Sequence, residues 1–177
     1  MKPQQFPHTK KYIIIDTCII QHAGSSDEGK SEAIIKCLEK LSSEEYSLAI
    51  SEFTLYENLH GIWGKKARQA AETLKSYEWK IVSNQVLTLA SMLGGLYKDE
   101  QVDYMTPGDK IIAATTILEH GFVLTENHRD FPSPFFICKQ FLPITYIANH
   151  HQRTIDLCLY EPNSPLIARR VNEKHKL

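Results

Sequence analysis

A short apolar run near the start of the chain most constrains the fold. Residues Tyr12–Ile15 are three isoleucines behind a tyrosine, and the run ends abruptly at Asp16-Thr17. An apolar run without polar alternation is typical of a strand that is buried on both faces, as in a parallel sheet. The sequence therefore predicts a central strand with an acidic residue directly after its end.

Similar short apolar runs recur along the chain, and helical spacing of apolar residues fills the intervals between them. Alternation of this kind predicts an α/β fold: a three-layer α/β/α domain with a central, mostly parallel sheet and right-handed crossovers. The further strands are predicted at Ser47–Ile50, Trp79–Val82 and Phe122–Thr125, and the helices at about 27–41, 54–62, 65–77, 85–97 and 107–120.

The pattern loosens after Phe131, where three prolines interrupt it. We expect an edge strand at 144–147 and one short strand near 155–159. The sequence thus predicts one domain over residues 1–147 and a C-terminal extension of unknown role over 148–177. A chain of 177 residues is long enough for one well-packed domain.

Charge and composition exclude some classes of protein. A net charge of −1 excludes a strongly basic nucleic-acid-binding domain, but an acidic catalytic cluster can cancel a basic binding face in the total. No apolar run reaches the roughly 18 residues of a membrane span, and the first eleven residues lack the apolar core of a secretory signal. We therefore expect a cytoplasmic protein without membrane contact, whose four scattered cysteines are reduced thiols.

Four acidic residues follow the ends of the predicted strands or begin the predicted helices. Asp16 follows the first strand, and Glu57 lies about one turn into the helix after the second strand. Asp109 lies in the first turn of the helix before the fourth strand, and Asp130 follows that strand near Asn127. In a parallel sheet the strand ends and the starts of the connecting helices lie at the same edge. We expect these side chains to meet there.

Each acid also has an ordinary structural explanation. Asp16 would cap the helix that follows it, and Thr54-x-x-Glu57 and Thr106-x-x-Asp109 both match the capping box. Asp130 fits a turn residue before Phe131-Pro132. Caps and turns are common, but three caps and a turn residue that share one edge by chance are a weaker explanation than one shared site.

A shared site of this composition points to a metal ion. Crowded carboxylates repel one another unless they are protonated or a cation joins them. A set of oxygen ligands suits Mg²⁺ or Mn²⁺, and the chain has no HExxH motif or Cys/His pair at zinc spacing. Such a site is typical of enzymes that hydrolyse phosphodiesters.

Three stretches of sequence resemble the signature blocks of a known family. IIIDTCII, ISEFTLYENLHG and TPGDKIIAATTILEHGFVLTENHRDF are similar to those of PIN domains, especially the VapC-type ribonuclease toxins of bacterial toxin–antitoxin pairs. The resemblance covers about residues 12–147. It implies a compact α/β domain, an endoribonuclease that depends on Mg²⁺ or Mn²⁺, an antitoxin partner and a homodimer. The apolar stripe at 86–96 is compatible with dimerisation.

The resemblance also assigns roles to individual residues. Asp16, Glu57 and Asp109 match the first three acids of the family. At the fourth position many relatives have an acid, whereas this chain has Asn127 followed by Asp130, so either residue completes the site. An amide at this position brings less charge, which makes a second metal ion less favourable.

Other residues are expected to support the ligands or contact RNA. Thr17 and Thr125 are expected to hydrogen-bond to the ligands. His128 is a weaker candidate for substrate contact, and Tyr56 for stacking on a base. The basic candidates for the RNA backbone are Lys65, Lys66, Arg68 and Arg129.

Two functions from different classes follow from these observations. The first is a metal-dependent endoribonuclease that acts as the toxin of a type II toxin–antitoxin pair. The alternative is a non-catalytic module of the same fold that binds RNA or protein. A haloacid-dehalogenase-like phosphatase would need a second aspartate two residues after Asp16, and that position is Cys18.

Overall fold

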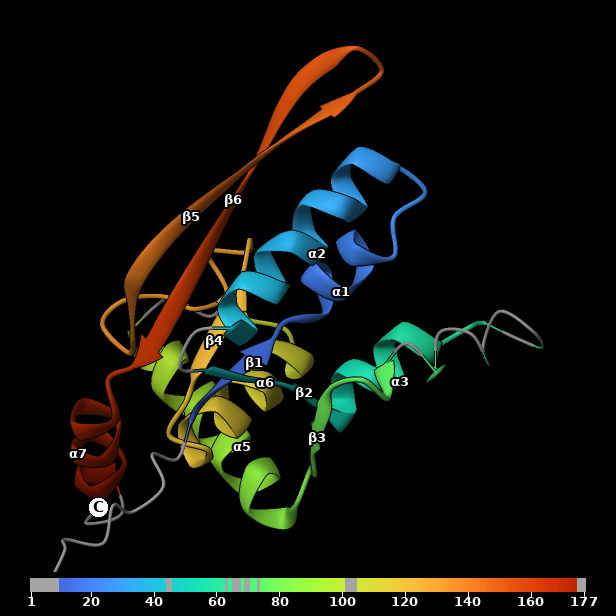
Figure 1. The fold of residues 1–177 in the computed structure, drawn as a ribbon. Helices are drawn as coiled ribbons and strands as arrows, with labels where there is room; N and C mark the ends of the chain where they lie inside the picture. The colour runs from blue at the N-terminus through green and yellow to red at the C-terminus, as the bar shows by residue number, and fades with distance from the viewer. Residues whose placement is uncertain are drawn as a thin grey trace, which may run out of the picture.

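The chain folds around one six-stranded sheet (Figure 1). The structure is a computed structural model that describes residues 10–43, 46–62, 64, 68, 71–72, 74–100 and 105–174. The strand order is β3-β2-β1-β4-β6-β5. The strands are β1 (Lys11–Ile15), β2 (Tyr46–Ser51), β3 (Glu78–Lys80), β4 (Phe122–Thr125), β5 (Phe136–Ala148) and β6 (His151–Pro162).

Three of the strand pairings are parallel and two are antiparallel. β1 lies between β2 and β4, β3 lies beside β2, and these four strands run in the same direction. β6 runs antiparallel to both β4 and β5. The predicted mixed α/β class with a mostly parallel sheet is confirmed. The helices are α1 (Thr17–Ala23), α2 (Glu28–Ser43), α3 (Glu52–Leu59), α5 (Asn84–Asp99), α6 (Pro107–Leu118) and α7 (Ser164–Lys174).

The isoleucines of β1 explain why that run lacks polar residues. Ile14 packs into a cluster with α5 and α6, whereas Ile13 and Ile15 pack into a second cluster with α1 and α2. All three side chains are fully buried. Burial of each contributes roughly 1.5–3 kcal/mol, so helices that cover both faces of the strand favour apolar residues at every position.

Several predicted helix boundaries are corrected by the caps. α3 begins at Glu52 with Ser51 as its N-cap, so Thr54 does not cap it and lies buried inside the helix. α5 begins one residue earlier than predicted, because Ser83 caps it. The helix predicted at 65–77 lies in part outside the described residues. No helix in the described ranges is long and apolar enough to cross a membrane.

The C-terminal residues form a hairpin whose strands are longer than the sequence predicts. The edge strand predicted at 144–147 is part of the much longer β5, and the strand predicted at 155–159 is part of β6. The hairpin projects beyond the rest of the sheet (Figure 1). Its two-residue loop, Asn149 and His150, has positive φ angles of 49° and 63°, as a tight hairpin turn requires.

The hairpin belongs to the same sheet as the preceding strands. Because β6 pairs with β4, residues after 148 supply an inner strand of the sheet, and α7 then packs on α5. A disulfide joins Cys138 on β5 to Cys158 on β6, with 6.1 Å between their Cα atoms. The prediction of four reduced thiols is therefore wrong for this pair.

The apolar stripe of α5 is buried within the chain itself. Val86, Leu93 and Leu96 are at most 4% exposed and belong to the core cluster on the α6 side of the sheet. This stripe is therefore not available as a dimer interface. The homodimer itself stays a prediction.

Candidate functional site

Asp16 links the ends of two neighbouring strands. As the N-cap of α1 it accepts a hydrogen bond from the backbone N–H of Thr17 at 2.7 Å. Its other oxygen accepts hydrogen bonds from Thr125 Oγ1, at the end of β4, at 2.6 Å and from Cys18 Sγ at 3.2 Å. The side chain is 5% exposed. Asp16 is therefore a cap and also a buried carboxylate at the predicted edge of the sheet.

Glu57 reaches the same edge from α3. Its Oε2 atom accepts a hydrogen bond from the Thr17 hydroxyl, so Thr17 joins the helix after β1 to the helix after β2. Because Ser51 caps α3, the predicted capping box of Thr54 and Glu57 is wrong. Glu57 is thus available for another role, and its carboxylate points towards the start of α6, where it lies beside Gly108.

Asp109 forms the predicted capping box at the start of α6. Its Oδ2 atom accepts hydrogen bonds from the Thr106 backbone at 2.8 Å and from the Thr106 hydroxyl at 2.6 Å. Its own N–H donates to the Thr106 hydroxyl at 3.2 Å. The cap fixes Asp109 on the same side of the sheet edge, and its charge acts on the other acids of the site.

Asp130 and Asn127 occur together in the turn after β4. The Asn127 backbone N–H donates to Thr125 Oγ1 at 2.9 Å, and the Asn127 side-chain amide donates to Asp130 Oδ2. Asp130 is 6% exposed. The sequence left open which of these two residues completes the site. In the structure the Asn127 amide is a hydrogen-bonding partner of the Asp130 carboxylate, and which of the two completes the site stays a prediction.

The four carboxylates influence one another electrostatically. Burial raises the pKa values of Asp16 and Glu57, and it raises the pKa of Asp130 to about 6. The charge of Asp109 adds to the rise in all three pKa values, and the charge of Asp16 adds to those of Glu57 and Asp130. Arg129 offsets only part of the effect at Asp130. The cluster is therefore short of positive charge.

The side chains of the site have the donor atoms that a hard divalent cation prefers, but they do not converge on one point. Carboxylate and amide oxygens are the ligands that Mg²⁺ and Mn²⁺ prefer. Within the described ranges, however, no three His, Cys, Asp or Glu side chains converge closely enough to hold an ion. The cap of α6 engages Asp109 Oδ2.

Three neighbouring residues support this edge and were not assigned a role in it from the sequence. His22 Nε2, on α1, lies 2.6 Å from Glu126 Oε1, and this contact anchors the turn that carries Asn127. Cys18 donates to Asp16. Gly108 allows close approach of α6 to α3. Of the three, only Gly108 could have been recognised from the sequence, because it stands between a proline that starts a helix and an acidic residue.

The predicted RNA contacts are only partly located. Arg129 is exposed in the same turn as Asp130, and Arg68 is exposed elsewhere. Lys65 and Lys66 lie outside the described residues.

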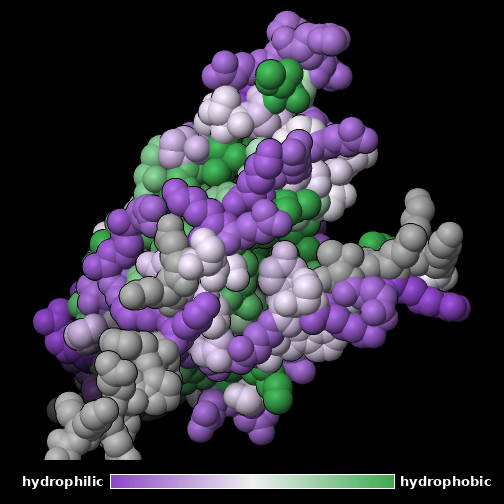
Figure 2. Space-filling view, viewed as in Figure 1, coloured by the Kyte–Doolittle hydropathy of each residue, from purple (hydrophilic) through white to green (hydrophobic). Residues whose placement is uncertain are grey.

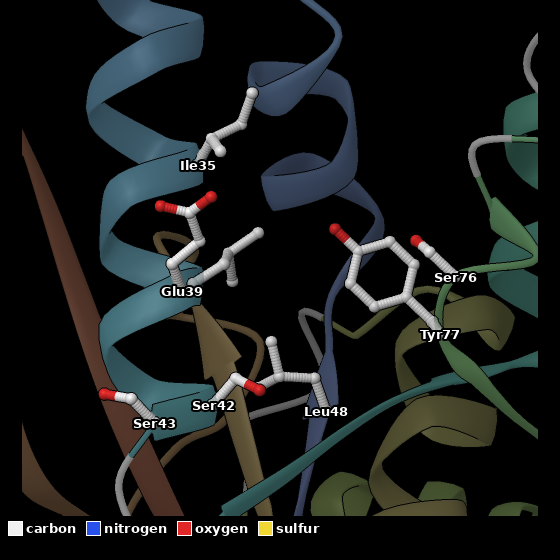
Figure 3. Close-up of a pocket in the computed structure, with 8 residues that line it drawn as sticks. Ile35, Glu39, Ser42, Ser43, Leu48, Ser76 and Tyr77 are labelled. Atoms are coloured by element: carbon white, nitrogen blue, oxygen red, sulfur yellow. The ribbon is translucent and has the colours of Figure 1, made fainter.

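The site is also distinct from a pocket elsewhere on the molecule. A pocket of about 390 Å³ lies between α2, β2 and residues 76–77, and Figure 3 shows Glu39 and Tyr77 on opposite sides of it. None of the four acids lines this pocket. Asp16 and Asp130 are instead buried, and Glu57 and Asp109 half-buried, at the edge of the sheet.

Thr125 is expected to contribute measurably to stability. Its hydroxyl is fully buried, donates to Asp16 and accepts from the Asn127 N–H, so Thr125→Val removes one of the hydrogen bonds to buried Asp16 and leaves the half-buried Asn127 N–H without this partner. We expect the free energy of unfolding to fall by about 1–3 kcal/mol in urea denaturation. The matched control Thr145→Val, on the exposed face of β5, should change it by less than about 0.5 kcal/mol. Equal effects of the two substitutions would contradict this role.

The raised pKa of Asp130 predicts a specific dependence of stability on pH. The folded protein binds this proton more tightly than the unfolded chain, whose pKa is near 3.8, so the stabilisation is complete below that pH. It is lost as the pH rises through about 6. In EDTA, thermal melting should show the wild type losing more stability than Asp130→Asn across this window. Parallel profiles would show that Asp130 is not perturbed.

Comparison with known proteins reveals similarity of fold only. No protein-family profile and no curated protein matches the chain. The structure is similar to VapBC2 from Rickettsia felis bound to a DNA fragment from their promoter, with a TM-score of 0.54, 21% identity, and coverage of 66% of this chain and 88% of that one. It is also similar to FitAcB from Neisseria gonorrhoeae, with a TM-score of 0.50, 17% identity, and coverage of 63% and 84%.

These comparisons correct the family assignment made from the three sequence blocks. The chain resembles the PIN-domain family and its VapC-type toxin ribonucleases in those blocks, but no family profile matches it. The similar solved structures are VapBC2 and FitAcB assemblies, one of them bound to DNA, at identities that show the fold alone. The chain is therefore not placed in that family, and its function must be argued from its own residues.

Proposed function

We propose that this protein is an endoribonuclease that depends on Mg²⁺ or Mn²⁺ and hydrolyses RNA phosphodiester bonds. The observation that supports this most is the gathering of carboxylates at one edge of the sheet, where Thr17 links Asp16 to Glu57 and Asn127 bonds to Asp130. Burial raises the pKa values of Asp16, Glu57 and Asp130, and the charge of Asp109 adds to each rise. A divalent cation relieves such repulsion. Asn127 would assist as the partner of Asp130.

The residues of the chain would hold the site in a defined arrangement. Thr125 and Thr17 orient Asp16 and Glu57 by direct hydrogen bonds, and Arg129 offers positive charge to a phosphate beside Asp130. When bound, the metal ion would lower the pKa of a water molecule and stabilise the leaving oxygen.

We also propose a biological setting. The similar structures belong to toxin–antitoxin systems. By analogy, we propose that this chain is the nuclease of such a pair, with an antitoxin-type protein as partner, and that it acts in the cytoplasm as a homodimer with a three-layer α/β/α domain. Fold-level analogy is the support for this setting.

A non-catalytic module that binds RNA or protein is the second candidate. It is favoured by one observation: within the described residues, no three potential ligands converge on an ion. The two candidates differ in turnover. A binding module would bind its ligand equally with and without a divalent metal and would release no shortened RNA.

The deciding experiment is a cleavage assay. Purified protein is incubated with end-labelled single-stranded RNA and MgCl₂, MnCl₂ or EDTA, and the products are separated by size. We expect cleavage with either metal and none in EDTA. The control variant Glu39→Gln, on the exposed face of α2, should cleave like the wild type, which shows that a single surface carboxylate does not matter. Intact RNA under all conditions would reject the nuclease proposal.

A further inference from the structure

A ladder of aromatic rings runs from the core to the surface beside the carboxylate turn. Phe131 is fully buried and stacks on Tyr160, with ring centroids 6.3 Å apart and planes at 26°. The Tyr160 ring lies 6.2 Å from the ring of His128, which lies 6.4 Å from the ring of Phe141. Phe141 is 55% exposed. The outer end of the ladder therefore presents an aromatic surface to solvent.

The ladder is held in a fixed position. His128 Nδ1 lies 3.1 Å from the Tyr160 hydroxyl, and the His128 backbone N–H donates to Glu126 O at 3.1 Å. His128 is also the residue between Asn127 and Arg129. The ring thus belongs to the same short turn that carries Asp130 of the proposed catalytic cluster.

Phe141 lies on the open side of the hairpin. Its neighbours in β5, Leu142 and Ile144, point to the other side and pack into the cluster that includes α2. Hydrophobic atoms are also visible at the surface near the tip of the hairpin (Figure 2), where Ile147 is 70% exposed. Of these two exposed apolar residues, only Phe141 contacts the turn with the carboxylate.

The chemistry of this surface favours a nucleobase as its ligand. A rigid exposed ring stacks on any base, because every base has a π-face, and Arg129 in the same turn offers positive charge to the phosphate. A base inside a duplex is already stacked on its neighbours. The surface therefore favours an unpaired base.

We propose that His128 and Phe141 form a stacking platform for one unpaired base of a single-stranded nucleic acid, next to the carboxylate cluster. This proposal deepens the proposed function, because it names the substrate class of that site. The platform itself requires no cleavage, so binding and turnover can be tested separately.

The test measures binding of a short fluorescent single-stranded RNA by anisotropy in EDTA, where no cleavage is expected. Phe141→Ala should bind the RNA about 5- to 150-fold more weakly than the wild type, because one base loses its stacking partner. Phe141→Trp should retain binding, and the matched control Ile147→Ala, at the exposed far end of β5, should equal the wild type. An abasic nucleotide at one position should weaken binding of the wild type but not of Phe141→Ala.

The outcomes separate the two proposals. If RNA binding depends on Phe141 but no metal-dependent cleavage occurs, the stacking platform is supported and the nuclease proposal is rejected. If Phe141→Ala cleaves and binds RNA within about twofold of Ile147→Ala, the nuclease proposal stands and the stacking platform is overturned. Absence of RNA binding in EDTA, or equal binding of duplex and single strand, would also overturn it, and a protein ligand would then be the better explanation of the exposed ring.

Discussion

The substitution Asp16→Asn is expected to abolish metal-dependent RNA cleavage while the protein stays folded. Asp16 accepts hydrogen bonds from Thr17, Cys18 and Thr125 and is the most deeply embedded carboxylate of the cluster. Loss of an outer hydrogen-bonding partner of a metal ligand typically costs 10- to 100-fold in activity, so loss of the ligand's charge should reduce kcat/KM by more than about 100-fold. Single-turnover cleavage of labelled RNA measures this effect.

Stability should change in the opposite direction from activity. Burial raises the pKa of Asp16, so its stabilising contribution is present below the unfolded pKa near 3.8 and is lost as the pH rises through the folded value. At neutral pH and in EDTA, the neutral asparagine side chain of the variant avoids the cost of a buried charge and can still accept from the Thr17 N–H. Urea denaturation should therefore give equal or greater stability for the variant. Lower stability with unchanged cleavage would mean that Asp16 is only a helix cap.

Gly108→Ala is expected to have the second largest effect, because it forces the Phe53 and Glu57 side chains of α3 to move. A Cβ atom at this position would lie 2.4 Å from Phe53 Cε1 and 3.0 Å from Glu57 Oε1. Overpacking of this kind costs about 1–3 kcal/mol. It would also displace Glu57, and small misplacement of a reacting group can cost about 100-fold in rate. Denaturation and cleavage assays on the same preparation should both show the loss.

The chain offers a matched control for this substitution. Gly95 lies inside α5, and a Cβ atom there would have no neighbour within 4 Å. Gly95→Ala should therefore raise the free energy of unfolding by about 0.5–1 kcal/mol, since glycine is unfavourable in a helix interior. If both alanine variants behave alike, close packing of α6 on α3 at Gly108 does not matter.

The sheet edge was predictable because local signals were strong there. The isoleucines of β1 are buried on both faces, so their pattern is unambiguous. The capping box of Thr106 and Asp109 involves residues three apart, which sequence spacing reveals directly. In a parallel sheet the ends of the strands and the starts of the connecting helices lie at one edge, which is why Asp16 and Asp109 were expected there.

The remaining features depend on contacts that the sequence does not encode locally. β5 alternates exposed and half-buried residues around Pro143, and its pairing with β6 extends far from the β4 edge. The disulfide requires this register to bring Cys138 near Cys158. The cap of α3 was misassigned because Ser51 and Thr54 are both good caps, and only the end of β2 decides between them.

The most direct test of the carboxylate cluster is a titration of the protein with Mn²⁺, followed by electron paramagnetic resonance. We expect a saturable site for which Mg²⁺ competes. Binding should be weaker in each of the variants Asp16→Asn, Glu57→Gln, Asp109→Asn and Asp130→Asn, but not in Glu39→Gln. Absence of saturable binding to the wild type, or identical binding by the wild type and all four variants, would contradict a shared metal site.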